Sequence, residues 1–210
     1  MPPRSDFGLT SAEAGRLRRL TPPWRIQKFL DDLDYDAPGE GCRSPRRVLR
    51  ERKVQCMDGA LFAAAALRVQ GEPPLILDLE AVFDDDHVLA VYRRNGLWGS
   101  IARSNYSGLR FREPLFRSVR DLVLSYVEAY FNLRRQKTLR RYSRPFDWSR
   151  TVTLIRQASR IGRAWQGTFA VVSISSTKRP VTPPEAKRAR VCPPNSEMTR
   201  ATLMPPPPGS

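Results

Sequence analysis

Two residues in the sequence, Cys56 and His87, could together carry nucleophilic chemistry. Cys56 starts an apolar, alanine-rich run that predicts a helix, so its thiol would lie where the helix leaves backbone N–H groups unpaired. Those donors and the helix dipole lower a thiol pKa and can hold an oxyanion on an attacked carbonyl. His87 opens a predicted strand and is the sole histidine, hence the one imidazole that could take the thiol proton. The pair predicts cysteine-dependent acyl chemistry.

Each of the two residues also has a purely structural interpretation. A free cysteine is often a small buried hydrophobic residue. His87 could be a structural histidine that follows a solvated Asp-Asp-Asp turn, 84–86. That turn lacks the ligand spacing and the Gly of a calcium loop, so we expect no metal and no cofactor. The other cysteines, Cys42 and Cys192, complete an odd and sparse set, which is typical of a reducing, cytoplasmic setting rather than a disulfide framework.

The elements that must position these residues follow from capping and turn signals. A capping box at Thr10 and a cap-plus-Pro signal at Ser44 start two helices, and Thr21-Pro22 opens another between them. The run from Cys56 to Gln70 predicts a buried helix. Strands follow at 75–82, 87–93 and 97–102, the last two joined by an Asn95-Gly96 hairpin. Ser118 caps a long helix to about 133. The order predicts an α+β fold with N-terminal helices packed on a small antiparallel sheet.

The order of these segments resembles the transglutaminase-like superfamily of papain-type Cys-His-Asp enzymes, and most closely its small bacterial members. The resemblance covers residues 44–105 and is carried by the segments 44–49, 56–68, 71–74, 87–92 and 96–101. It implies that Cys56 is the nucleophile, His87 the base, and that an Asp or Asn orients the imidazole. Position 102, where the family usually has that Asp, is Ala, and the nearest candidate is Asn105. The site is therefore a Cys56–His87–Asn105 triad, a dyad or a retired site.

Two functions follow from this resemblance. The first is acyl transfer or hydrolysis on a protein or peptide amide, through a thioester on Cys56. The second is a catalytically retired binding module of the same fold, which uses its basic C-terminal region to engage nucleic acid or an acidic partner. The residues do not distinguish a transferase from a protease, because the two differ only in whether an amine or water resolves the acyl-enzyme.

The charge divides the chain into unequal parts. Residues 1–133 hold 20 basic and 18 acidic residues, whereas residues 134–210 hold 16 basic and 3 acidic. We therefore expect a body over 1–133, a basic and partly ordered extension over 134–175, and a disordered proline-rich tail over 176–210. Aromatic residues among the arginines of 134–163 are compatible with nucleic-acid binding, although a solvated basic face is the favoured interpretation. No apolar run is long enough to span a membrane.

Overall fold

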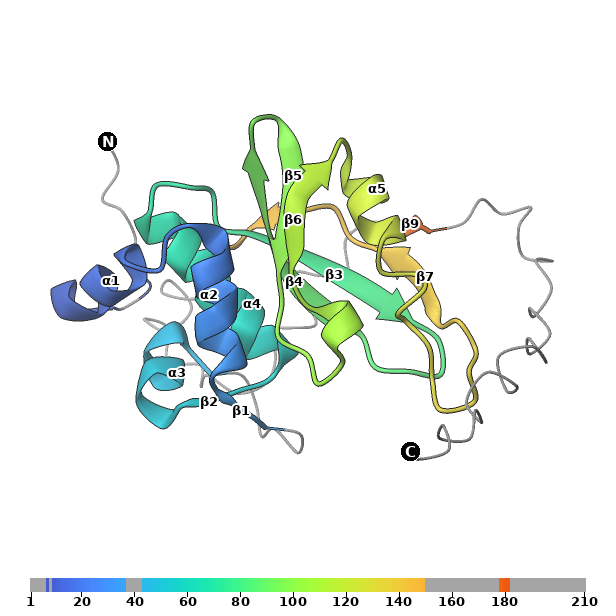
Figure 1. The fold of residues 1–210 in the computed structure, drawn as a ribbon, viewed down its shortest axis with the longest axis horizontal. Coiled ribbons are helices and arrows are strands. Elements are labelled where there is room, and N and C mark those ends of the chain that lie inside the picture. Colours follow the sequence, from blue (N-terminus) through green and yellow to red (C-terminus); the bar gives the residue numbers. More distant parts are fainter. Residues whose placement is uncertain (1–6, 8, 37–42, 150–177, 182–210) are drawn as a thin grey trace, which may run out of the picture.

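The structure is a computed structural model, and it describes residues 7, 9–36, 43–149 and 178–181. It confirms the α+β class: the described residues form five α-helices and a seven-stranded antiparallel sheet, with a separate parallel pair of short strands. Figure 1 shows α1 to α4 gathered at one end of the molecule and the large sheet extending away from them. The elements of the first part are α1 (Ser11–Arg18), α2 (Pro23–Asp31), β1 (Asp34–Tyr35), α3 (Pro45–Glu51), β2 (Lys53–Val54) and α4 (Cys56–Val69).

The sheet follows α4 in the chain. Its strands have the order β6-β5-β4-β3-β7-β9, and β8 also pairs with β3. The Asn95-Gly96 turn joins β4 to β5, and both residues have positive φ, 51° and 80°. The bounds are β3 (Leu75–Ala81), β4 (His87–Arg94), β5 (Leu97–Ile101), the short 3-10 helix η1 (Ser107–Leu109), β6 (Arg112–Phe116), α5 (Val119–Leu124), β7 (Leu139–Tyr142), β8 (Phe146–Asp147) and β9 (Arg179–Pro180).

Helix α4 is the centre of the fold. It contacts α1, α2 and α3 on one side and strands β3, β4 and β5 on the other. Its residues from Asp58 to Leu67 are all buried, which the apolar composition of the run predicts. Phe62 stacks on Phe29 of α2 with ring centroids 4.9 Å apart. This packing holds the N-terminus of α4, and with it Cys56, in a fixed place.

Each face of the sheet packs on its own hydrophobic core. Side chains alternate along β4, so that Val88 and Ala90 join the core beneath α4, while Leu89 and Val91 join the core of the opposite face. The second core includes Leu122, Tyr126 and Tyr130, from α5 and the turns after it, and Leu109 of η1. One face of β4 therefore packs against α4, and the other face packs against α5, η1 and the turns after α5.

One sequence-based boundary is wrong. The helix predicted from Ser118 to about 133 ends at Leu124, where the Ser125 hydroxyl donates to the Leu122 carbonyl at 2.6 Å and a run of turns follows. Part of the predicted extension packs on the body, because β7 and β8 pair with β3 in the sheet. Within the predicted tail, residues 178–181 are described: β9 pairs with β7, and Val181 is buried in the second core. The remainder of the extension and tail, 150–177 and 182–210, lies outside the described residues, as does Cys192.

Candidate functional site

Cys56 is the first residue of α4, and its side chain is half-buried. Burial raises the pKa of the Cys56 thiol, and the negative charges of Asp58 and Asp85 raise it further. The backbone amides of Val88 and Met57 oppose this rise. The predicted surroundings are thus present, namely a helix N-terminus and amide donors. Because burial dominates, however, the resting sulfur is a neutral thiol at pH 7.

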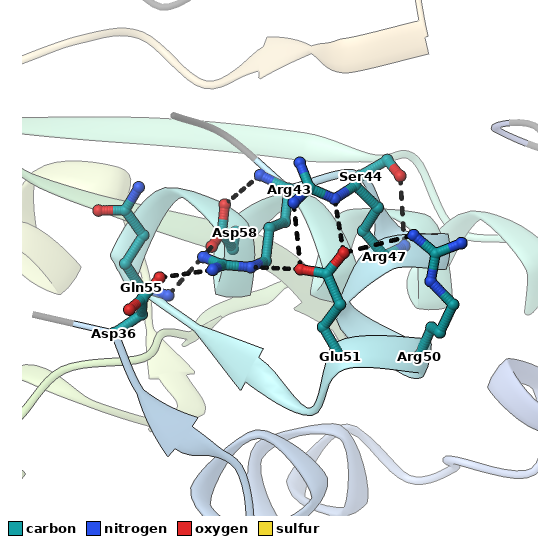
Figure 2. Close-up of polar contacts among 8 residues, drawn as sticks. All are labelled: Asp36, Arg43, Ser44, Arg47, Arg50, Glu51, Gln55 and Asp58. Atoms are coloured by element: carbon teal, nitrogen blue, oxygen red, sulfur yellow. Dashed lines mark hydrogen bonds and ion pairs between the residues drawn. The ribbon is translucent and has the colours of Figure 1, made fainter. Parts of the chain in front are cut away.

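A buried ionic cluster fixes the first turn of α4 (Figure 2). Arg43 lies among three carboxylates from three segments of the chain: Asp36 after β1, Glu51 at the end of α3, and Asp58 in α4. The N···O distances are 2.5 Å to Asp36, 3.0 Å to Glu51 and 3.3 Å to Asp58. The Asp58 carboxylate also accepts the backbone N–H of Arg43 at 2.6 Å and that of Gln55 at 3.2 Å. Asp58 thereby ties the start of α4 to the neighbouring segments.

The charges of this Arg43 cluster compensate one another. Burial lowers the pKa of Arg43, but its hydrogen bonds to Asp36, Glu51 and Asp58 outweigh that effect and raise it. The Arg47 hydrogen bond, aided by Arg43, lowers the pKa of Glu51 to about 2. Burial raises the pKa of Asp58 despite the hydrogen bonds that stabilise its charge. No sequence motif identifies this cluster; its one local signal is Asp58, an acidic residue in the first turn of an otherwise apolar helix.

His87 is the first residue of β4, and its imidazole is buried, with 5 % of the residue exposed. Its Nε2 lies 2.8 Å from the carbonyl oxygen of Leu109 in η1. A carbonyl oxygen only accepts, so Nε2 carries the proton and Nδ1 holds the free lone pair. Burial lowers the pKa of His87 to about 4, and the hydrogen bond to Leu109 opposes this only in part. The imidazole is therefore uncharged at pH 7.

The backbone beside His87 lies near the Cys56 sulfur, since the Val88 amide acts on the pKa of the thiol. The two side chains are not hydrogen-bonded to each other: in the described part of the chain, the hydrogen bond of the imidazole goes to Leu109. By strand alternation His87 shares the face of Leu89 and Val91, whereas Val88 faces α4. The resting site thus holds a neutral thiol and a neutral imidazole rather than a thiolate–imidazolium pair.

Asn105, the candidate orienting residue, lies in the loop between β5 and η1, and its side chain is exposed. The imidazole is oriented instead by the Leu109 backbone, whose carbonyl oxygen accepts the hydrogen bond from Nε2 of His87. A backbone carbonyl has no residue signature, so no sequence pattern identifies it. The orienting role of Asn105 stays a prediction.

The acidic turn 84–86 is exposed, as the solvated-turn interpretation requires. Asp84 accepts the Thr138 hydroxyl at 2.6 Å, and Asp86 accepts the Ala81 amide at 2.8 Å. Among the described residues, no group of three His, Cys, Asp or Glu side chains is arranged to hold a metal ion. Nor does the described part of the chain contain a helix long and apolar enough to cross a bilayer.

No protein-family model matches the chain, and no curated protein matches it either.

Proposed function

We propose that the protein catalyses cysteine-dependent acyl transfer or hydrolysis on amide substrates, through a thioester on Cys56. The observation that carries the proposal is the environment of the sulfur: it lies at the N-terminus of a buried helix, and the backbone amides of Met57 and Val88 act on the pKa of the thiol. Such donors can stabilise the oxyanion that forms when a carbonyl is attacked. The transglutaminase-like order of residues 44–105 supports the same chemistry.

In the proposed reaction, His87 acts as a general base toward a neutral thiol. As the sulfur attacks the carbonyl carbon, the thiol proton passes to Nδ1, the nitrogen left free by the Leu109 contact. The C–N bond then breaks, and the leaving amine takes that proton. Water or a second amine attacks the thioester and releases Cys56 as a thiol. For the first step, the imidazole must leave the Leu109 carbonyl and turn from the face of Leu89 and Val91 toward α4, so that Nδ1 comes within hydrogen-bond reach of the sulfur when substrate binds.

The experiment uses a full-length parent in which Cys42→Ser and Cys192→Ser leave Cys56 as the only thiol. The parent is mixed with p-nitrophenyl acetate, and nitrophenol release and the intact mass are followed together. We expect a burst of one nitrophenol per chain and one acetyl group, located on Cys56. The matched Cys56→Ser variant should show neither. A parent that acquires no acetyl group on Cys56 would refute the proposal.

A second candidate function is the retired binding module, which the uncharged resting site favours. Several arginines of the basic region are exposed, among them Arg134, Arg140 and Arg144. Within the described residues, none of these three forms an ion pair with a carboxylate, whereas Arg141 pairs with Glu80. Exposed arginines at the β7 side of the sheet suit a polyanionic partner.

The test of this second function is binding of a fluorescent single-stranded oligonucleotide, measured by anisotropy at about 50 mM and about 200 mM salt. A binding module should lose affinity steeply with salt and should lose it again when Arg134, Arg140 and Arg144 are changed together to Gln. The same affinity in the parent and the triple variant would refute it.

A further inference from the structure

Arg103 lies two residues after β5 and is buried, with 6 % of the residue exposed. Its Nη1 donates to the Ser104 carbonyl at 2.7 Å, and its Nη2 donates to the Leu33 carbonyl at 3.1 Å. Its Nε is buried and has no hydrogen-bond partner among the described residues. A buried N–H without an acceptor costs about 1–3 kcal/mol, more when the group is charged. The side chain is thus incompletely satisfied by the protein itself.

Arg103 also lacks a counter-charge in contact. In the described part of the chain it forms no ion pair, and Asp31, whose charge acts on it from a distance, is bound to Arg110 at 3.1 Å. The contrast with Arg43 is direct, because that equally buried arginine contacts three carboxylates. Proteins rarely bury a charge without a partner. Within the described residues, Arg103 is therefore a buried positive charge without an anionic partner.

The position of Arg103 connects it to the Cys56 end of α4. Gly59, one turn beyond Cys56, packs so closely that an added Cβ would lie 2.6 Å from the Arg103 Cβ. On the other side, the Arg103 guanidinium lies 5.2 Å from the centroid of the Tyr35 ring. Burial raises the pKa of Tyr35, and the charges of Cys56 and Arg103 act on it with opposite signs. Tyr35 is therefore within electrostatic reach of both.

We propose that Arg103 and Tyr35 form a subsite for a carboxylate of the substrate that acylates Cys56. The proposal rests on the proposed acyl chemistry and names its substrate class: amides that carry a carboxylate near the bond to be broken. A carboxylate is the natural acceptor for the unpaired guanidinium Nε–H, which is buried at rest and must be uncovered when the carboxylate binds, since charge-assisted bonds of this kind are short and strong. The half-buried Tyr35 ring, which the guanidinium faces, would form a wall of the subsite.

The first test compares two alkylating reagents of nearly equal size, iodoacetate and iodoacetamide, on the parent whose only thiol is Cys56. The measured quantity is the ratio of the two rate constants, referred to the same ratio for N-acetylcysteine amide. We expect the protein ratio to favour iodoacetate by at least tenfold. Arg103→Gln should return the ratio to that of the small thiol, and Arg103→Lys should retain part of the preference.

Arg110→Gln is the matched control, because it removes a neighbouring positive charge that belongs to the Asp31 pair. If Arg110→Gln lowers the ratio as much as Arg103→Gln, a general electrostatic field explains the preference and the subsite does not exist. A parent that shows no preference for iodoacetate also overturns the proposal. A Cys56 that reacts with neither reagent counts instead against the acyl chemistry.

A second measurement does not depend on the thiol or on any Arg103 variant. Acetate is titrated into the ¹⁵N-labelled parent, and the Nε–H signal of Arg103 is followed by NMR, with chloride at equal ionic strength as the control. We expect a saturable shift with acetate alone. An unchanged Nε–H signal up to saturating acetate refutes the subsite, whatever the reactivity of Cys56.

Discussion

The sole histidine of the chain makes a sharp prediction for acid stability. His87 is buried and neutral, and its pKa falls from 6.5 to about 4 on folding. Between these two values the unfolded chain binds a proton that the folded chain does not bind, so the free energy of unfolding falls as the pH falls. At about 1.4 kcal/mol for each pH unit that separates the two pKa values, the total loss is about 3 kcal/mol. The loss begins below about pH 6.5 and is complete below about pH 4.

The assay is urea unfolding at constant ionic strength, from about pH 7 to about pH 3, on the protein and on His87→Gln. The Gln amide can still donate to the Leu109 carbonyl, but it does not titrate. Acidic groups with shifted pKa values, such as Glu51 and Asp58, are present in both proteins and cancel in the difference. We expect the wild type to lose about 3 kcal/mol more than the variant.

A direct titration checks the same reasoning. With one histidine in the chain, the ¹³C–¹H spectrum contains one imidazole spin system, which needs no assignment. We expect its shift to stay constant from about pH 7 to about pH 5, because the folded imidazole does not protonate in this range. A titration midpoint at about 6.5 or above, or equal acid sensitivity in the two proteins, would show that the imidazole is not buried and neutral.

Three further predictions concern the frame around Cys56. Arg43→Leu should lower the free energy of unfolding, measured in urea, by about 3 kcal/mol or more, because it leaves buried carboxylates without their counter-charge. A loss below about 1 kcal/mol would contradict this expectation. Gly59→Ala should lower the free energy of unfolding by about 1–3 kcal/mol, since its Cβ would meet Arg103. Gly15→Ala, in the open part of α1, should instead raise it by up to about 1 kcal/mol. Equal effects of the two substitutions would show that Gly59 is not tightly packed. Asp58→Asn should lower the pKa of the Cys56 thiol, because it removes a nearby negative charge. The pH dependence of alkylation by iodoacetamide measures this pKa. An unchanged or raised midpoint would contradict the prediction.

Local signals in the sequence were sufficient wherever a short segment decides its own structure. Thr10 and Glu13 form the predicted capping box, and Ser44 caps the helix that Pro45 begins. The helix from Cys56 and the turn at Asn95-Gly96 follow in the same way. In each case, one hydrogen bond or one backbone conformation that the residue type favours determines the outcome.

Local sequence patterns did not predict the structure where contacts between distant segments determine it. The helix from Ser118 stops early because Arg112, from β6, donates to the side chain and backbone oxygens of Ser125 and competes with continuation of the helix. Strand β7 lies in the region that the sequence marks by its excess of basic residues, and its own sequence, Leu-Arg-Arg-Tyr, does not alternate. A bulge lets Leu139 and Tyr142 both reach the core, and the two arginines between them remain exposed.

The candidate site shows the same division. The sequence predicts Cys56 at a helix start and His87 at a strand start, because both positions follow from local patterns. The partners of these residues, the Arg43 cluster and the Leu109 carbonyl, come from segments far away in the chain. Whether a side chain is ionised depends on those partners and on burial, so the neutral state of the site was not accessible to sequence reasoning.

The most direct test of the central claim is the pH dependence of Cys56 acetylation by p-nitrophenyl acetate, measured by mass spectrometry in the single-thiol parent and in its His87→Gln variant. If neutral His87 takes the proton of neutral Cys56, both groups keep their reactive state from about pH 5 to about pH 8, and the parent rate is constant over this range. The variant, which has only its thiolate to react, should instead accelerate about tenfold for each pH unit. Parallel, steeply rising profiles in the two proteins would contradict the role of His87 as the base.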